Sequence, residues 1–244
     1  MITDKTPIYR YVSFDRFSKM VYDKKLAVIS PKKWPDGYER YWLKWLDSES
    51  GKQRLRDWLT ADGVDIDQAF ETVNQICRYL GKMTYCLCFS EEKDAEVLWN
   101  AHSDNNHCVM FATTEEKLRN NLPDPFDCTV KPIFYDFDSS THFTRFLSQI
   151  YIIDGKPSLW DIDELFLHKR PCFLYEKEVR LICRVDEPSD NGVIEFDIPY
   201  LNELIDGVMV HPAAEEYYVS LVKLMCEQHD IPFWGKSELY TLKL

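Results

Sequence analysis

The stretch Phe173-Leu-Tyr-Glu-Lys-Glu-Val-Arg-Leu-Ile-Cys-Arg-Val185 decides how this chain is organised. Side chains of a β-strand alternate between two faces, and that alternation predicts a strand across the stretch. One face is apolar and carries Val179, Leu181, Cys183 and Val185. The other carries Glu176, Glu178, Arg180 and Arg184, with Ile182 among them. Charged side chains about 7 Å apart in one row favour the wall of a pocket. The alternative is an edge strand whose charges prevent aggregation.

The composition indicates a soluble globular protein. The chain has 244 residues, of which 45% are hydrophobic and 14% aromatic, so it can bury a substantial core. No apolar run approaches the ~20 residues that span a bilayer, and the N-terminus lacks the pattern of a signal peptide. We expect one domain over residues 1–244, a cytoplasmic location and no membrane partner.

Metal binding and broad nucleic-acid binding are both disfavoured. The eight cysteines form no Cys-x-x-Cys motif, and no His-x-x-x-His is present, so we expect buried free thiols and no metal. The alternative is a ligand set of His102, His107 and Cys108. A net charge of −12 repels phosphate backbones.

The order of elements favours an α+β fold over a doubly wound α/β fold, because short strands and helices alternate with few strand–helix–strand units. Residues 38–80 resemble a helical insertion, since apolar side chains recur there at helical spacing. The expected helices cover 41–46, 55–59 and 66–80, and Gly81 is expected to end the last one. Strands are expected at 8–12, 26–30, 84–90, 107–111, 129–135, 193–198, 207–210, 231–233 and 238–244.

Three segments together resemble a widespread bacterial family of uncharacterised proteins. They are Tyr9-Arg-Tyr11, Cys88-Phe-Ser-Glu-Glu-Lys-Asp-Ala-Glu-Val-Leu-Trp99 and Tyr175-Glu-Lys-Glu-Val-Arg-Leu-Ile182. The resemblance spans residues 8–243. The chain departs from the family at 33–39, where Lys-Trp-Pro-Asp-Gly-Tyr-Glu replaces a Phe-Asn-Asp-Pro-Phe-Glu segment, and at Val179, where Trp is usual.

That family is more remotely similar to ADP-ribosyltransferases. The resemblance implies a split mixed β-sheet with flanking helices, an NAD cleft between its halves, and NAD as the substrate. The order of the family's motifs is matched by Arg10, then Phe89-Ser90, then Glu178 with Glu176 two residues before it. It implies a nucleotide as small-molecule partner, an unidentified protein or nucleic-acid acceptor, and a role as a toxin or phage-defence effector.

The resemblance also implies a role for each side chain. Cleavage of the nicotinamide–ribose bond develops an oxocarbenium-like cation, which Glu178 would stabilise while holding the ribose hydroxyls. Glu176 would orient or deprotonate the acceptor. The NAD contacts would come from Arg10 on the diphosphate or nicotinamide–ribose side, from Tyr11 or Trp99 stacked on nicotinamide, and from Ser90 and Arg180.

Other interpretations remain open. Arg10 can instead form a salt bridge to one of the glutamates. The whole chain can be a non-catalytic module that binds a nucleotide or protein, which the changed segment at 33–39 favours. Glu176 and Glu178 can also serve a glycosidase or nuclease as an acid/base pair or as Mg²⁺ ligands.

Overall fold

A computed structural model describes residues 3–40, 44, 48–59, 65–103, 105–122, 127–136, 138–153, 156–159 and 162–242. In this part of the chain nine strands form one mixed sheet, in which β10 and β11 are parallel and the other paired strands are antiparallel. Its strands are β1 (Pro7–Ser13), β2 (Lys25–Ile29), β3 (Thr84–Ser90), β4 (Cys108–Thr114), β5 (Asp127–Pro132), β8 (Glu178–Arg184), β9 (Val193–Asp197), β10 (Gly207–Val210) and β11 (Phe233–Lys236). β6 (Ile150–Ile153) and β7 (Lys156–Leu159) form a separate hairpin.

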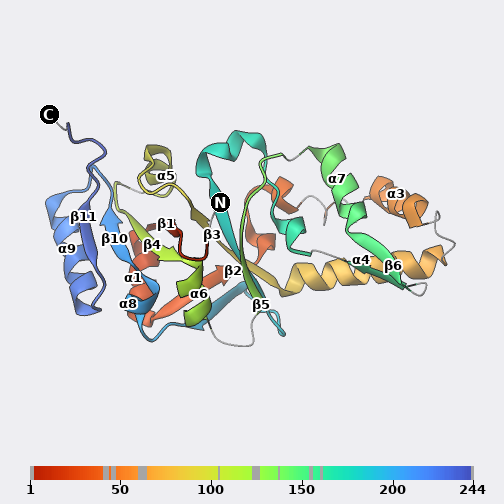
Figure 1. The fold of residues 1–244 in the computed structure, drawn as a ribbon, viewed down its shortest axis with the longest axis horizontal. Coiled ribbons are helices and arrows are strands. Elements are labelled where there is room, and N and C mark those ends of the chain that lie inside the picture. The colour runs from red at the N-terminus through yellow and green to blue at the C-terminus, as the bar shows by residue number, and fades with distance from the viewer. Residues whose placement is uncertain are drawn as a thin grey trace.

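Helices cover the sheet and extend beyond one end of it (Figure 1). α9 lies beside β10 and β11 at one end of the molecule, and α3, α4 and α7 lie with β6 at the other. The helices are α1 (Phe14–Asp23), α3 (Glu49–Leu59), α4 (Ile66–Met83), α5 (Glu96–Ala101), α6 (Glu115–Asn121), α7 (Ser139–Ser148), α8 (Leu201–Leu204) and α9 (Glu216–Gln228). The α+β fold with a mixed sheet, flanking helices and a helical insertion is therefore confirmed.

The insertion differs from its expected form in one respect. α4 continues through Gly81 to Met83 and runs directly into β3, so Gly81 does not end it. Asp65 caps the start of α4, where its side chain accepts a hydrogen bond from the Gln68 N–H. The expected helix at 41–46 falls largely outside the described residues.

β8 lies inside the sheet, so the edge-strand alternative is wrong. It pairs with β3 along one side and with β5 along the other. Val179, Leu181 and Cys183 point into the main core, as the apolar alternation predicts. The opposite face is buried as well, with Glu178 4% and Arg180 0% exposed. The charges of this strand therefore belong to the interior of the protein.

The first half of the deciding stretch is not a strand. Residues Pro171–Glu176 form a 3₁₀ helix, which Pro171 begins and which Lys177 ends in a left-handed conformation with φ of 39°. Proline suits the first turn of a helix, because it lacks the N–H that would be unpaired there. Glu176 therefore leaves the strand and approaches the site from a turn.

The sheet splits along one side of β3. Its partners there are β1, at the pair Tyr9↔Ser90, and β2, at the pair Ile29↔Cys86. The two strands separate after these contacts, since β1 continues onto β4 and β2 onto β9. The split matters because Arg10, next to Tyr9, can reach into it.

The C-terminal part of the chain shows a further difference. Residues 238–242 contain a turn, closed by a hydrogen bond from the Thr241 N–H to the Glu238 carbonyl, in place of the expected final strand.

In the described part of the chain, every helix is too short or too polar to cross a bilayer.

A leucine pair within the deciding stretch tests the assignment of the core face. Leu181 is buried in the main core, whereas Leu174 is 58% exposed. We expect Leu181→Ala to lower the free energy of unfolding by about 2–5 kcal/mol, because it leaves a cavity. Leu174→Ala is the matched control and should change it by about 0.5 kcal/mol or less. Equal losses in urea denaturation would contradict the assignment.

Candidate functional site

Strand register assembles the candidate site. Tyr9 pairs with Ser90, and Ser90 pairs with Glu178, so positions from the beginning, middle and late part of the chain form one row across three strands. Directly opposite residues in antiparallel strands have Cβ atoms about 4.5–5.5 Å apart. The three motifs, which are far apart in the sequence, are therefore neighbours in the sheet.

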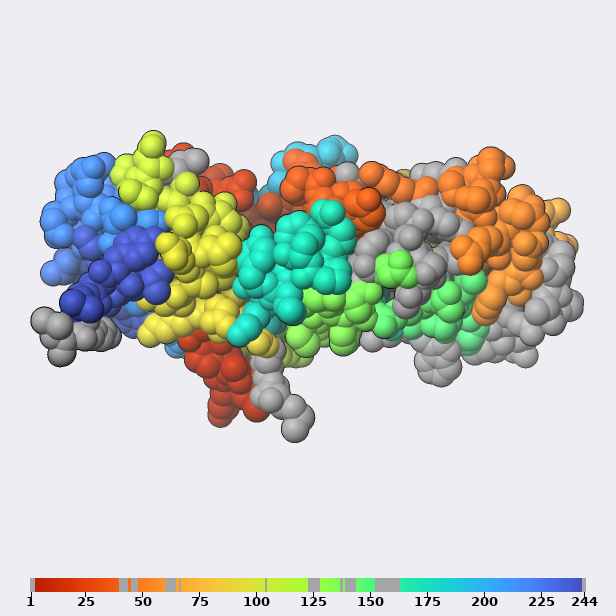
Figure 2. Space-filling view, turned by 90° about the horizontal axis from the view of Figure 1, so that it is seen from above, coloured from red at the N-terminus to blue at the C-terminus, as the bar shows by residue number. Residues whose placement is uncertain are grey.

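These positions border one cleft of about 230 Å³. Figure 2 shows the corresponding hollow, with the yellow segment around α5 on one side and the orange and teal segments near residues 34–39 and 169–178 on the other. The cleft is lined by Arg10, Tyr11, Ser90, Glu176 and Glu178 from the predicted set, and also by Trp34, Glu39, His102 and Lys169. The residues predicted to contact NAD or to catalyse its cleavage are therefore largely brought together.

Glu178 is held by two cations. Its Oε1 accepts hydrogen bonds from Arg180 Nε at 2.8 Å and from a terminal guanidinium nitrogen at 2.6 Å. Its Oε2 accepts one from Lys169 Nζ at 3.0 Å. A buried carboxylate needs such partners, because burial without them costs several kcal/mol. The Glu178 carboxylate is thus fixed in one orientation at the wall of the cleft.

The same cations hold two more carboxylates. Lys169 Nζ lies 2.5 Å from Glu176 Oε2 and 3.9 Å from Glu39 Oε1. Arg180 lies 2.7 Å from Glu39 Oε2 and also donates to the Phe166 carbonyl. Glu39, Glu176, Glu178, Lys169 and Arg180 therefore form one buried network, which we call the charge cluster.

The charge cluster fixes the protonation states of its members. Burial by itself raises the pKa of Glu178, but Arg180 and Lys169 lower it to about 2. Burial raises the pKa of Glu176, and the Lys169 ammonium opposes that rise. Burial would lower the pKa of Lys169, but Glu178, Glu39 and Glu176 raise it. The cleft therefore pairs a firmly ionised carboxylate with a second carboxyl of higher pKa.

The segment before Glu39 covers the charge cluster. Trp34 lies against Arg180, with the guanidinium carbon 4.2 Å from the ring centroid. Asp36 receives a hydrogen bond of 3.1 Å from Arg170, whose guanidinium also lies over the Tyr38 ring. These contacts belong to residues 33–39, so this segment forms part of the wall of the cleft.

Arg10 fills the split in the sheet. One of its terminal nitrogens donates a 2.5 Å hydrogen bond to the Cys88 carbonyl on β3. Among the described residues no carboxylate lies within 4 Å of it, so the alternative salt bridge to a glutamate does not form there. Burial and the nearby Arg16 lower the pKa of Arg10. The guanidinium thus keeps donors available at the cleft.

Ser90 and Tyr11 shape the cleft through contacts with the backbone. The Ser90 hydroxyl donates to the Glu176 carbonyl at 2.7 Å and accepts from the Glu92 N–H at 3.0 Å. The Tyr11 hydroxyl donates to the Glu92 carbonyl and accepts from the Ala95 N–H. Ser90 therefore ties the turn that carries Glu176 to the strand that faces Glu178.

Two of the predicted NAD contacts lie behind the wall. Trp99 is fully buried, and its indole N–H donates to Asp94 at 2.7 Å. Its ring packs edge-on against Tyr11, with centroids 4.9 Å apart, so Tyr11 separates it from the cleft. Arg180 is also fully buried and acts on Glu178. The structure gives these two side chains positions that support the wall.

Lys169 and Glu39 were missed by the sequence reasoning. Lys169 stands seven and nine residues before the two glutamates that it contacts, and a lysine at such a distance is ordinary in a surface loop. Glu39 lies 141 positions from Arg180 in the chain. One sequence feature pointed to Glu39. It lies in residues 33–39, where the sequence differs from the family pattern that it resembles elsewhere.

The proposed metal ligands are not brought together. His102 lies at the cleft and stacks on Tyr11 with ring centroids 6.4 Å apart, whereas His107 contacts Tyr217. Burial, together with Arg10, lowers the pKa of His102 to about 4. In the described part of the chain no group of three or more His, Cys, Asp or Glu side chains is placed to hold a metal ion.

Neither a family model nor a curated protein matches the chain. Solved structures of Thermus sp. 2.9 DarT do match. The complex with ADP-ribosylated ssDNA matches at 10% identity over 96% of this chain and 95% of that one, with a TM-score of 0.42. The complex with NAD⁺ matches at 12% identity over 96% of both chains, and the complex with carba-NAD⁺ at 12% over 95% of both, each with a TM-score of 0.40. Such a likeness does not establish a shared activity, and the membership of the uncharacterised bacterial family stays a prediction.

Removing Arg180 tests the charge cluster. Arg180→Leu leaves Glu178 and Glu39 buried with Lys169 as their common partner, and we expect it to lower the free energy of unfolding by about 3–5 kcal/mol. Arg170→Leu is the matched control and should lower the free energy of unfolding far less, because the ion pair of Arg170 with Asp36 is partly exposed. The measurement is urea denaturation at neutral pH.

A second substitution makes this test specific. If Arg180→Leu destabilises the protein because buried carboxylates lose a cationic partner, then adding Glu39→Gln should restore part of the lost free energy of unfolding. No recovery in the double variant would mean that the loss comes from packing against Trp34.

Proposed function

We propose that this chain cleaves the nicotinamide–ribose bond of NAD and passes the ADP-ribosyl group to an acceptor or to water. The observation that carries the proposal is the Tyr9–Ser90–Glu178 row, which supports one cleft with an ionised carboxylate on one side. On the other side lies Arg10, which has no carboxylate partner among the described residues. A dinucleotide needs both, since its diphosphate is anionic and its reacting ribose becomes cationic.

In this proposal Glu178 acts on the developing charge. The bond between the ribose anomeric carbon and the nicotinamide nitrogen breaks, and its electron pair leaves with neutral nicotinamide. The remaining oxocarbenium ion is stabilised by the Glu178 carboxylate, whose low pKa keeps it ionised at neutral pH. A ribose hydroxyl replaces the Lys169 ammonium on Oε2, while Lys169 keeps its contact with Glu176.

Glu176 serves the second half of the reaction. The acceptor attacks the anomeric carbon and loses a proton, which the Glu176 carboxylate accepts. A base is more effective when its pKa is raised toward the working pH, and burial raises the pKa of Glu176. Arg10 binds the diphosphate, and Tyr11 lies beside the nicotinamide. An enzyme of this kind depletes NAD, which fits a toxin or phage-defence effector.

One observation favours a second candidate, a non-catalytic nucleotide-binding module. Both oxygens of Glu178 already have hydrogen-bond partners, which neutralise part of the charge that catalysis would use. Calorimetry separates the two functions. Binding of NAD without release of nicotinamide would favour the module.

The chemistry is tested by substitution of the carboxylate. We expect wild-type protein incubated with NAD to release nicotinamide, measured by chromatography. Glu178→Gln should lower kcat/KM about 100-fold or more, because the amide carries no charge to offset the oxocarbenium ion. Glu227→Gln on α9, an exposed carboxylate outside the cleft, is the matched control and should retain wild-type turnover. Full turnover by Glu178→Gln would sink the proposed role.

A further inference from the structure

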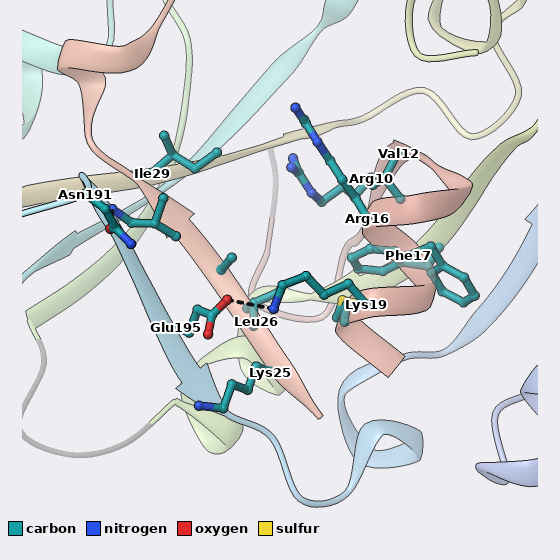
Figure 3. Close-up of a pocket in the computed structure, with 14 residues that line it drawn as sticks. Arg10, Val12, Arg16, Phe17, Lys19, Lys25, Leu26, Ile29, Asn191 and Glu195 are labelled. Carbon is teal, nitrogen blue, oxygen red and sulfur yellow. Dashed lines mark hydrogen bonds and ion pairs between the residues drawn. The ribbon is translucent and has the colours of Figure 1, made fainter. Parts of the chain in front are cut away.

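A second cavity, of about 340 Å³, lies between α1 and the paired strands β2 and β9. Figure 3 shows its lining side chains converging from these elements. Of the described lining residues it shares Arg10 alone with the cleft. Val12 borders this cavity, whereas Tyr9 and Tyr11, on the opposite face of β1, border the cleft. Arg10 therefore stands between two separate hollows.

Two arginines in this cavity have no carboxylate partner in the described part of the chain. Lys19 is paired with Asp23 at 2.5 Å and with Glu195 at 3.1 Å, and Lys25 lies 3.6 Å from Asp197. Among the residues that the structure describes, no such pair forms at Arg10 or at Arg16. Neighbouring positive charges repel each other, and an anion placed between them removes that repulsion.

The two arginines reach the same cavity from different elements. Arg10 comes from β1 and Arg16 from α1, and both line this cavity. In Figure 3 their side chains point the same way, and burial together with the charge of Arg16 lowers the pKa of Arg10. Lys19 is turned away toward Glu195. Arginine pairs of this kind bind phosphate oxygens by several charge-assisted hydrogen bonds.

Apart from the charged side chains named above and Asn191, the lining of the cavity is apolar. Phe17 and Leu26 are buried at its floor, with Met20 and Phe111 beside them. Small-molecule sites are mostly apolar cavities with a few polar groups that set orientation, and about 300 Å³ lies at the lower end of their range. The cavity thus suits a ligand with a flat or aliphatic body and one anionic group.

We propose that this cavity binds a small phosphorylated molecule of mononucleotide size, with its phosphate on Arg10 and Arg16 and its body on the apolar floor. The site does not depend on the activity proposed for the cleft. Because Arg10 serves both hollows, a phosphate bound here draws the guanidinium from the cleft. Occupancy of the second cavity would then weaken diphosphate binding in the first.

The proposal is tested by calorimetric titration of the full chain with AMP, and in parallel with inorganic phosphate. AMP should bind. The affinity for inorganic phosphate should be lower by about tenfold or by a larger factor, since phosphate lacks a body for the apolar floor. Arg16→Gln should weaken AMP binding about tenfold, because it removes charge-assisted hydrogen bonds. Arg16 is exposed on α1, so the variant should fold normally.

Two further variants locate the bound AMP. Ala27→Leu projects a larger side chain from β2 into the cavity and should also weaken binding about tenfold. Arg54→Gln removes an arginine from α3, at the other end of the molecule in Figure 1, and should leave binding unchanged. Absence of AMP binding, or equal affinity in wild type and either cavity variant, would overturn the proposal. An affinity for inorganic phosphate equal to that for AMP would overturn the ligand class.

Discussion

The site depends on the hydrogen bonds that Arg180 and Lys169 both donate to the Glu178 carboxylate. Arg180 has no exposed surface and Glu178 almost none, so neither charge can be left unpaired. Arg180 also connects distant parts of the chain. From β8 it donates hydrogen bonds to Glu39, in the segment before α3, and to the Phe166 carbonyl, in the turn before Lys169. A carboxylate fixed in this way faces a ligand without first having to be ordered.

The split at β3 supplies the opposite half of the cleft. A sheet that continued without interruption would pair the backbone near Cys88 with a neighbouring strand. Here Arg10 takes that place and donates to the Cys88 carbonyl. The backbone therefore remains satisfied while a guanidinium stands between two hollows. One side chain thus links the cleft that carries the carboxylates to the cavity under α1, and the two proposals share this single structural cause.

Features of the fold that depend on local sequence patterns could be predicted, whereas features that depend on contacts between distant residues could not. The apolar face of β8 followed from alternation, because Val179, Leu181 and Cys183 all contact the same core. The order of Arg10, Ser90 and Glu178 pointed to one cleft, but their adjacency comes from strand register over about 80 residues, which no local pattern encodes. The 3₁₀ helix of Pro171–Glu176 was mistaken for strand, because its aromatic residues also suit a strand.

Lys169, the second cation on Glu178, and Glu39, which binds the same two cations, could not have been predicted, since they gain their importance through tertiary contacts alone. The most direct test is a ¹³C NMR titration of the Glu178 side-chain carboxyl, assigned with Glu178→Gln. Because the folded pKa lies below the ordinary value of 4.5, the stabilising contribution of this group is present above that value and is lost as the pH falls toward 2. The account predicts a carboxylate that remains ionised from neutral pH down to about 2. A midpoint at or above 4.5 would contradict it.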